Sequence, residues 1–426
     1  MNNLSEKILS SREYKFNKIQ FLKTSYKVVI TVKSNIPGNN KNLNVSYILV
    51  EFFEKLIPLN MIEYSCFHDG YDGPYFLLGS NLDPVAIKQI LMDIEETHPL
   101  GRFIDLDVYD GNQTLSRGTM RKCYLCDDFA FKCIKMNKHK KKDLLNFVNS
   151  NVLNFFKKQV LSQVNESIMF ELNLHPKFGL VTPLTNGSHK DMNFNLMIKA
   201  KESILPFFIK MFEVGWSDKK LEDIFLAIRQ IGLQAEKEML AATNNVNTYK
   251  GLIFDLGIVV TAYGYTLYNH IDRGNIFDII KKMTLSLLEE FKVESNTFGY
   301  TAYKNHNILG ARGEIFNGLP NVKRALDYLD DFTDESRLKT LMYLISKVDD
   351  TTLLKRTKDY EMYISIKQRF SKKLKCNQEE IEMLNSYCIS NNLSFGGSAD
   401  LLILTIFLKK IFMWILKMSL IEYVII

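Results

Sequence analysis

The sequence predicts a multidomain protein in which an N-terminal α+β domain is followed by an all-α helical domain. The chain has 426 residues, which is too long for one typical hydrophobic core. Short runs of β-branched and aromatic residues lie in the first third. Beyond about residue 144, apolar residues recur at three- and four-residue intervals instead. We therefore place an α+β domain at residues 1–152 and a helical domain at residues 153–426.

The first third predicts a mixture of strands and helices. Residues 26–32 are β-branched and aromatic and run into the turn-forming stretch 35–40, which indicates a strand followed by a turn. Apolar runs at residues 75–78 and 103–108 predict two further strands. Residues 84–96 have the spacing of a helix.

The rest of the chain predicts helices. Helical spacing occurs at residues 145–164, 221–240, 276–291, 322–329, 338–348 and 381–389. Polar residues at 135–142 and 149–151 indicate where the two domains join.

The C-terminal apolar runs, residues 401–408 and 411–416, resemble a membrane segment. Lys409, Lys410 and Lys417 interrupt them well short of the roughly 18 to 20 apolar residues that a spanning helix needs. We expect a buried final helix and no membrane span.

Composition and charge limit the class of protein. Its 54 basic and 48 acidic residues leave a net charge of only +6, so we expect no nucleic-acid partner. The first 19 residues are polar and contain no signal-like apolar run, which predicts a cytoplasmic protein. Its six cysteines should then be mostly reduced thiols.

A first group of charged residues surrounds the strand predicted at 103–108. Asp105 and Asp107 are two residues apart, so both should project from the same face. Such a pair can hold Mg²⁺ against a phosphate, and Arg102, Arg117 and Arg121 supply guanidinium groups suited to phosphate oxygens. The alternative is two exposed carboxylates on a half-buried strand.

Three cysteines and a histidine follow this strand. Cys123, Cys126, Cys133 and His139 have the spacing C-x(2)-C-x(6)-C-x(5)-H and could close a tetrahedral Zn²⁺ site. The alternative is that these are reduced cysteines that only pack.

Together with residues 35–38 and Lys41, these two patterns resemble the holo-citrate-lyase synthase family over about residues 5–150. The resemblance implies transfer of a phosphoribosyl-dephospho-CoA group to a serine of the citrate lyase acyl carrier (gamma) subunit, with release of diphosphate. For that chemistry, metal ions on Asp105 and Asp107 would clamp the attacking and leaving oxygens. Arg102 and Arg121 would neutralise phosphate charge.

Four polar motifs interrupt the helical region, and each has glycine beside a charged residue. They lie at residues 176–192, 247–251, 310–314 and 396–400. Glycine allows backbone amides to approach a phosphate, and a following helix N-terminus favours anions. Any single motif could be a helix cap, with Thr248 or Ser398 as the N-cap residue, but four in one domain favour a nucleotide site.

These motifs resemble the triphosphoribosyl-dephospho-CoA synthase family over about residues 155–408. The resemblance implies that the 2′-hydroxyl of 3′-dephospho-CoA displaces adenine from ATP. Two positions depart from the family pattern: Phe178 replaces a second proline, and Tyr249 replaces a histidine. A phenol can still donate a hydrogen bond, so we expect the tyrosine to reduce activity rather than abolish it.

Glycosyl transfer from ATP requires a proton donor for adenine, stabilisation of an oxocarbenium-like ribose and a base for the incoming hydroxyl. We assign Asp191 and Glu314 as candidate base and cation stabiliser, and Asp400 as a further carboxylate that could act through Mg²⁺. His189 is a candidate proton donor or phosphate contact. The residues expected to face the triphosphate are Lys177, Lys190, Lys250 and Arg312.

The sequence thus predicts one chain with two successive transferase activities, with ATP, 3′-dephospho-CoA and the acyl carrier subunit as partners. One alternative is a non-enzymatic nucleotide-binding helical scaffold with a small zinc-binding domain. Another is a chain in which only the N-terminal transferase is active.

Overall fold

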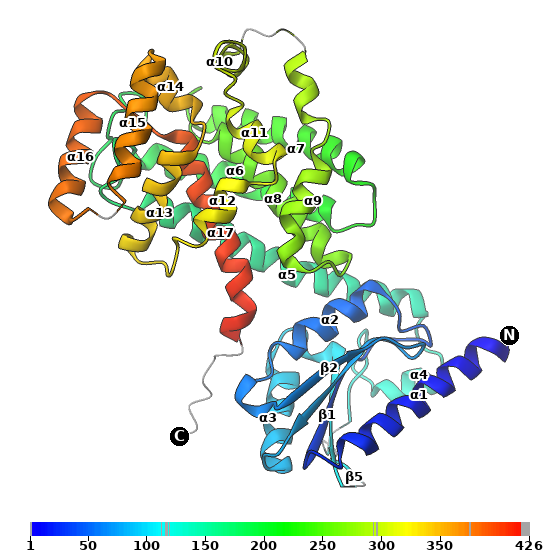
Figure 1. Ribbon diagram of the computed structural model, residues 1–426. Helices are drawn as coiled ribbons and strands as arrows, with labels where there is room; N and C mark the ends of the chain where they lie inside the picture. The colour runs from blue at the N-terminus through cyan, green and yellow to red at the C-terminus, as the bar shows by residue number, and fades with distance from the viewer. Residues whose placement is uncertain are drawn as a thin grey trace. The chain divides into compact units, whose positions relative to one another are not determined.

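The computed structural model describes residues 2–111, 113–115, 118, 120–292, 294, 297–374 and 376–418 (Figure 1). The chain divides into two compact units. The N-terminal unit comprises Met1–Phe156 with Met413–Ile426, and the helical unit comprises Lys157–Phe412. Arg117 and residues 419–426 lie outside the described residues.

The N-terminal unit is built on a five-stranded antiparallel sheet with the strand order β2-β3-β1-β4-β5. The strands are β1 (Val28–Ser34), β2 (Tyr64–His68), β3 (Tyr75–Ser80), β4 (Ile104–Asp110) and β5 (Gln113–Thr114). Its helices are α1 (Asn2–Leu22), α2 (Asn44–Glu54), α3 (Pro84–Thr97) and the short α4 (Ala130–Lys135).

Helices cover both faces of this sheet. Ile19 and Leu22 of α1 pack with Val29 and Leu77 on one face. Helices α2 and α3 contact β1 and β4, where the alternate residues such as Ile30 are fully buried. The strands expected at 26–32, 75–78 and 103–108 and the helix expected at 84–96 are confirmed as β1, β3, β4 and α3.

The helical unit follows along α5, which runs without a break from Lys141 to Leu172. The polar residues 149–151 therefore lie within a helix rather than in a linker. Val148, Val152 and Phe156 belong to a stripe at four-residue spacing that is at most 1% exposed. The remaining helices are α6 (Phe194–Gly215), α7 (Leu221–Ala242), α8 (Lys250–Tyr268), α9 (Ile276–Met283), α10 (Phe298–His306), α11 (Gly310–Phe316), α12 (Pro320–Ala325), α13 (Asp334–Lys347), α14 (Thr351–Thr357), α15 (Tyr360–Lys372), α16 (Gln378–Ser390) and α17 (Gly396–Met418).

Helix α8 forms the centre of this unit and packs against α6, α7 and α9. Among the described residues it is the one helix long and apolar enough to cross a membrane, but 72% of its most apolar window is buried. Burial in the core accounts for its composition. The single helix expected at 276–291 is α9 followed by a separate 3₁₀ turn, Leu287–Lys292.

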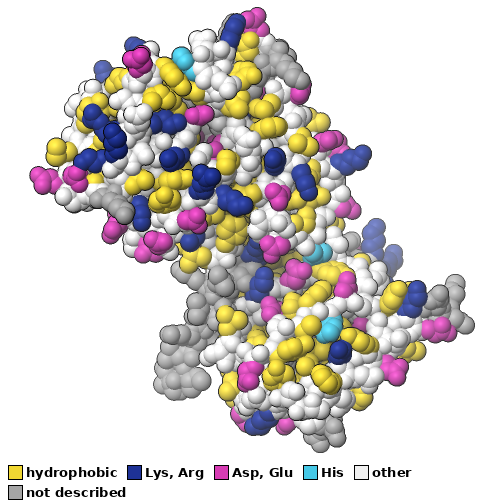
Figure 2. All heavy atoms as spheres, in the orientation of Figure 1, with side chains coloured by type: hydrophobic (Ala, Val, Ile, Leu, Met, Phe, Trp, Pro, Cys, Tyr) yellow, Lys and Arg dark blue, Asp and Glu magenta, His cyan; other side chains and the backbone are white. Residues whose placement is uncertain are grey.

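The final helix α17 explains the C-terminal apolar run. Residues 401–408 are all at most 2% exposed, as expected for a buried final helix. On the face drawn in Figure 2, Lys and Arg side chains are interspersed with Asp and Glu over both units, in keeping with the small net charge.

Candidate active sites

A cavity of about 860 Å³ in the helical unit brings the four polar motifs together. Each motif contributes to its lining, although together the motifs span more than 200 residues of sequence. The candidate residues that line the cavity are Lys177, His189, Asp191, Lys250, Arg312 and Asp400.

Several helices begin at this cavity. The lining includes Lys250 and Gly251 at the start of α8, Phe298 and Gly299 at the start of α10, and the first residues of α17, Gly396 and Gly397. The shorter helices α11 and α14 also contribute residues from their first turns. The positive end of the helix dipole favours anions at such positions. The cavity is therefore suited to a polyphosphate.

Two carboxyl groups in the lining have pKa values well above the usual range. Asp255, on α8, is 1% exposed, and burial followed by the charge of Glu314 raises its pKa to about 8. Burial, together with the neighbouring carboxylates Asp255, Glu171 and Asp350, also raises the pKa of Asp400 well above its usual range. Asp400 Oδ2 lies against Gly251, where an added Cβ would be only 2.3 Å away. Only glycine at this position lets the carboxyl reach the first turn of α8.

Three buried polar atoms in the lining have no hydrogen-bond partner: Thr248 Oγ1, the Tyr249 hydroxyl and Asp255 Oδ1. Buried polar atoms in native proteins are almost always paired. Burial, with the charges of Glu171 and Asp400 nearby, raises the pKa of Tyr249 well above its usual value, so the phenol keeps its proton. These three atoms remain available for hydrogen bonds within the cavity.

Lys177 is committed to a buried ion pair. Its Nζ lies 2.8 Å from Glu171 Oε1 and donates to the Glu171 carbonyl at 3.1 Å, and the Lys177 side chain is 2% exposed. Burial lowers the pKa of Lys177, and the Glu171 carboxylate opposes that shift.

His189 uses both ring nitrogens within the protein. Its Nε2 lies 2.9 Å from Ser394 Oγ, and Arg356 Nη2 lies 3.3 Å from its Nδ1. Since arginine can only donate, this pairing assigns the ring proton to Nε2. Burial and then the charge of Arg356 lower the pKa of His189, which keeps the ring neutral. Asp191, whose side chain is 63% exposed, lies 3.9 Å from Nδ1.

Two further cations of the lining form exposed ion pairs. Lys250 Nζ lies 2.8 Å from Glu236 Oε2, and Arg312 Nε lies 3.0 Å from Glu290 Oε2. Such exposed pairs are weak and can exchange their partner for a phosphate.

Two predicted residues do not line the cavity. Glu314 accepts hydrogen bonds from Asn321 N at 2.7 Å, Asn321 Nδ2 at 2.8 Å and Val322 N at 3.2 Å, so its carboxylate caps the start of α12. Lys190 is exposed.

The backbone of Phe178 has a φ of 50°, and its ring packs edge-on against Phe370. A proline, with φ fixed near −65°, cannot adopt this conformation, so the turn itself differs from one containing a second proline.

In the N-terminal unit, the alternation of β4 places Asp105 and Asp107 on the same face of the sheet. Asp107 Oδ2 pairs with Lys33 Nζ at 2.6 Å, and Asp105 Oδ1 pairs with Arg121 Nη1 at 2.8 Å. Burial alone would lower the pKa of Lys33, but the charge and hydrogen bond of Asp107, together with the charge of Asp105, outweigh it and the pKa is raised. Burial lowers the pKa of Lys41, next to Asp105, Lys141 and Lys33.

Of the three candidate arginines, Arg102 and Arg121 are described, and both bond to protein groups. Arg121 Nη2 donates to Glu95 Oε1 at 2.9 Å and to the Ile104 carbonyl at 3.0 Å. Arg102 donates to the Lys122 carbonyl and stacks on Tyr124, 4.9 Å from the ring centroid. The basic side chain beside the two aspartates that the sequence reasoning missed is Lys33.

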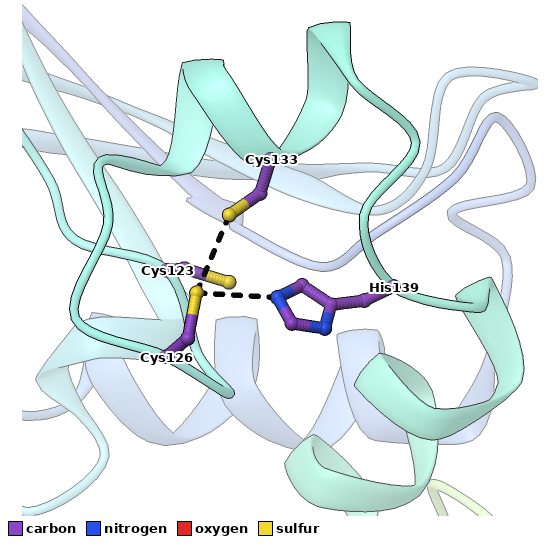
Figure 3. Close-up of side chains that lie close together, drawn as sticks. All are labelled: Cys123, Cys126, Cys133 and His139. Carbon is purple, nitrogen blue, oxygen red and sulfur yellow. Dashed lines mark hydrogen bonds between the residues drawn. The ribbon is translucent and has the colours of Figure 1, made fainter.

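Cys123, Cys126, Cys133 and His139 converge on one point, as Figure 3 shows. One ligand atom from each residue lies within 4.8 Å of all the others. Cys126 Sγ is 3.5 Å from Cys133 Sγ and 3.2 Å from His139 Nε2.

The chain matches two protein-family models in succession. Residues 4–155 match the CitX model, described as apo-citrate lyase phosphoribosyl-dephospho-CoA transferase. Residues 157–417 match the CitG model, described as ATP:dephospho-CoA triphosphoribosyl transferase.

Several curated proteins are similar along most of their length. Protein CitXG of Leuconostoc mesenteroides subsp. cremoris is 32% identical over 95% of this chain and 96% of the relative. Protein CitXG of Haemophilus influenzae is 29% identical over 94% of this chain and 95% of that relative. The 2-(5''-triphosphoribosyl)-3'-dephosphocoenzyme-A synthase of Haemophilus ducreyi is 32% identical over 66% of this chain and 98% of that protein.

Proposed function

Because the chain belongs to the family of two-domain CitXG proteins, we propose that its two transferase reactions take place at two separate sites. The protein makes triphosphoribosyl-dephospho-CoA from ATP and dephospho-CoA and transfers the phosphoribosyl-dephospho-CoA group to apo-citrate lyase. We assign the first reaction to the cavity of the helical unit. The second is assigned to the Asp105 and Asp107 face of the N-terminal sheet.

The observation that carries the first assignment is the make-up of the cavity. Helix N-termini supply a field for the triphosphate, while Thr248, Tyr249 and Asp255 offer unpaired polar atoms to the nucleoside. The reaction breaks the bond between ribose C1′ and adenine and forms a bond from C1′ to the 2′-oxygen of dephospho-CoA. The departing base must gain a proton, and the attacking hydroxyl must lose one.

We assign proton donation to Asp255. Its pKa of about 8 leaves the carboxyl protonated at neutral pH, as a general acid requires. Asp191 is assigned as the base for the incoming hydroxyl because it is exposed at the lining. Tyr249 hydrogen-bonds the nucleoside in place of the histidine usual in the family.

Asp400 is the residue that we assign to Mg²⁺. The Glu171 and Asp350 carboxylates act on it with like charge, and a divalent cation would relieve this repulsion. When bound, Mg²⁺ neutralises triphosphate oxygens. His189 orients Arg356, and Glu314 holds α12 in place.

In the N-terminal unit, the serine hydroxyl of the carrier attacks the phosphorus next to the ribose and diphosphate leaves. Asp105 and Asp107 offer carboxylate oxygens of the kind that Mg²⁺ prefers, on one sheet face. Lys33 and Lys41 contact the phosphates. Arg121 fixes Asp105, since its guanidinium already has three protein partners.

We further propose a division of the activities near residue 152, because the two matched family models meet at residues 155 and 157. A cytoplasmic location is supported by the nucleotide substrates and by six unpaired cysteines.

Two separate assays test the assignment. The purified chain with ATP, Mg²⁺ and dephospho-CoA should release adenine. With supplied triphosphoribosyl-dephospho-CoA and apo carrier it should add one phosphoribosyl-dephospho-CoA mass to the carrier. A chain that attaches the group but releases no adenine would leave only the N-terminal transferase active.

A further inference from the structure

The segment from residue 120 to residue 140, which we call the thiol loop, has almost no hydrophobic core of its own. Cys133 is its one buried residue, whereas Met120, Phe131, Ile134 and Met136 are 51% to 74% exposed. Its regular structure amounts to the six-residue helix α4 and a bridge between Lys122 and Phe129. Apolar burial cannot hold such a segment in one conformation.

What the loop does have is a convergence of four metal-binding side chains. The four ligand atoms lie within 4.8 Å of one another (Figure 3), and Cys126 Sγ lies 3.5 Å from Cys133 Sγ and 3.2 Å from His139 Nε2. Sulfur atoms bound to one tetrahedral Zn²⁺ are about 3.8 Å apart, given Zn–S bonds of about 2.3 Å. A disulfide would need about 2.05 Å.

We propose that Cys123, Cys126, Cys133 and His139 bind one Zn²⁺ ion in a closed, structural site. Three thiolates and one imidazole complete a tetrahedral shell, with no position left for a substrate. The ion cross-links the two ends of the thiol loop and supplies the folding free energy that its small apolar core does not.

The thiol loop also carries side chains of the proposed transferase site, and this second part of the inference rests on that proposed function. Arg121, two residues before the first ligand, pairs with Asp105 at 2.8 Å. Tyr124 lies between two ligands, supports Arg102 through its ring and donates to the Asn35 carbonyl. Zn²⁺ therefore positions Arg121 and, through it, Asp105.

The first test is the metal content of the full chain. Elemental analysis should find about one zinc per chain, and growth with Co²⁺ should give the visible bands of tetrahedral cobalt bound by thiolates. Cys126→Ser should lose the metal, whereas Cys126→His, which keeps a ligand, should retain it. Cys66→Ser is the matched control, since Cys66 lies in β2 of the same unit and outside the cluster. Equal zinc in Cys126→Ser and Cys66→Ser would overturn the site.

The second test separates the metal from the chemistry. Removal of Zn²⁺ from the wild-type chain with a Zn²⁺-selective chelator, followed by assay in excess Mg²⁺, should lower the transfer of supplied precursor at least tenfold, and added Zn²⁺ should restore it. Adenine release should stay unchanged. Zinc that is lost without any effect on transfer would overturn the positioning part. A zinc-loaded wild-type chain with no transfer activity at all would instead refute the proposed N-terminal site and leave the metal site standing.

Discussion

Asp255 is a carboxyl group buried within the apolar helix α8, and its pKa of about 8 makes it the proposed proton donor. Replacing it by asparagine keeps its shape but removes the acid. We predict that Asp255→Asn lowers the rate of adenine release by about 10² to 10⁴, the usual contribution of general acid catalysis. Transfer of supplied precursor should be unchanged. Asp278→Asn, an exposed position on α9, is the control, and equal rates in the two variants would contradict the assignment.

The same residue predicts a pH dependence of stability. The pKa of Asp255 rises from about 3.9 in the unfolded chain to about 8 in the folded one, so the folded state binds the extra proton between these values. The stabilisation that this proton provides is complete below about pH 4. It decreases as the pH rises from there and is fully lost above about pH 8. Relative to Asp255→Asn, the wild type should lose up to about 1.4 kcal/mol of unfolding free energy per pH unit between pH 5 and 8. Urea unfolding without metal or substrate measures this, and a difference independent of pH would refute it.

Tyr249 carries a buried hydroxyl with no protein partner. An unsatisfied buried donor destabilises the folded state. The free energy of unfolding of Tyr249→Phe should therefore be about 1 kcal/mol higher than that of the wild type. Adenine release should nevertheless fall, because the hydroxyl is proposed to bind the nucleoside. Tyr249→His, the residue usual in the family, should release adenine at least as fast as the wild type. Unchanged adenine release by Tyr249→Phe would show that the hydroxyl does not contact the substrate.

At the scale of elements, the first turn of α8 has to accommodate the carboxyl group of Asp400. A Cβ at Gly251 would lie 2.3 Å from Asp400 Oδ2, so Gly251→Ala should displace that carboxyl and reduce adenine release at least tenfold. Gly232→Ala on α7 is the matched control, because its added Cβ would meet only ordinary contacts from 3.6 Å. The two variants are compared by adenine release and thermal unfolding. Full activity in Gly251→Ala would contradict the role of Asp400.

The elements that the sequence predicted were those with a regular pattern. Strands β1, β3 and β4 are short apolar runs, and α3 begins with a proline behind an aspartate cap. Helix α1 was missed because most of its residues are polar and exposed, while only a few, such as Ile19 and Leu22, are buried. The polar residues 149–151 suggested a linker because they occupy the solvent-facing side of α5.

The site was predictable only where it lies in loops. Glycine-rich motifs indicated the starts of α8, α11 and α17. Glu171 and Asp255, in contrast, lie inside helices whose apolar pattern predicts only a buried core. A lone carboxylate in a helix as apolar as α8 is the signal that could have identified Asp255. Glu314 was assigned to chemistry because its motif is charged, yet a charged residue between helices can equally cap one of them. Sequence spacing does not distinguish these two roles.

In the whole molecule, one chain is proposed to carry two chemically independent sites. The observations behind this proposal are a cavity in the helical unit lined by the starts of several helices and a separate pair of carboxylates on the N-terminal sheet. The two family models match successive parts of the chain with almost no sequence between them, which agrees with one activity in each unit. A covalent fusion keeps the two activities at a fixed ratio, whatever the route of the intermediate.

The most direct test crosses two variants with two assays. Adenine release and transfer of supplied precursor are measured for Asp400→Asn and for Asp105→Asn in the full chain. The two-site account predicts that Asp400→Asn loses adenine release and keeps transfer, while Asp105→Asn loses transfer and keeps adenine release. If each substitution, in a chain that still folds, abolished both reactions equally, the account of two separate sites would be wrong.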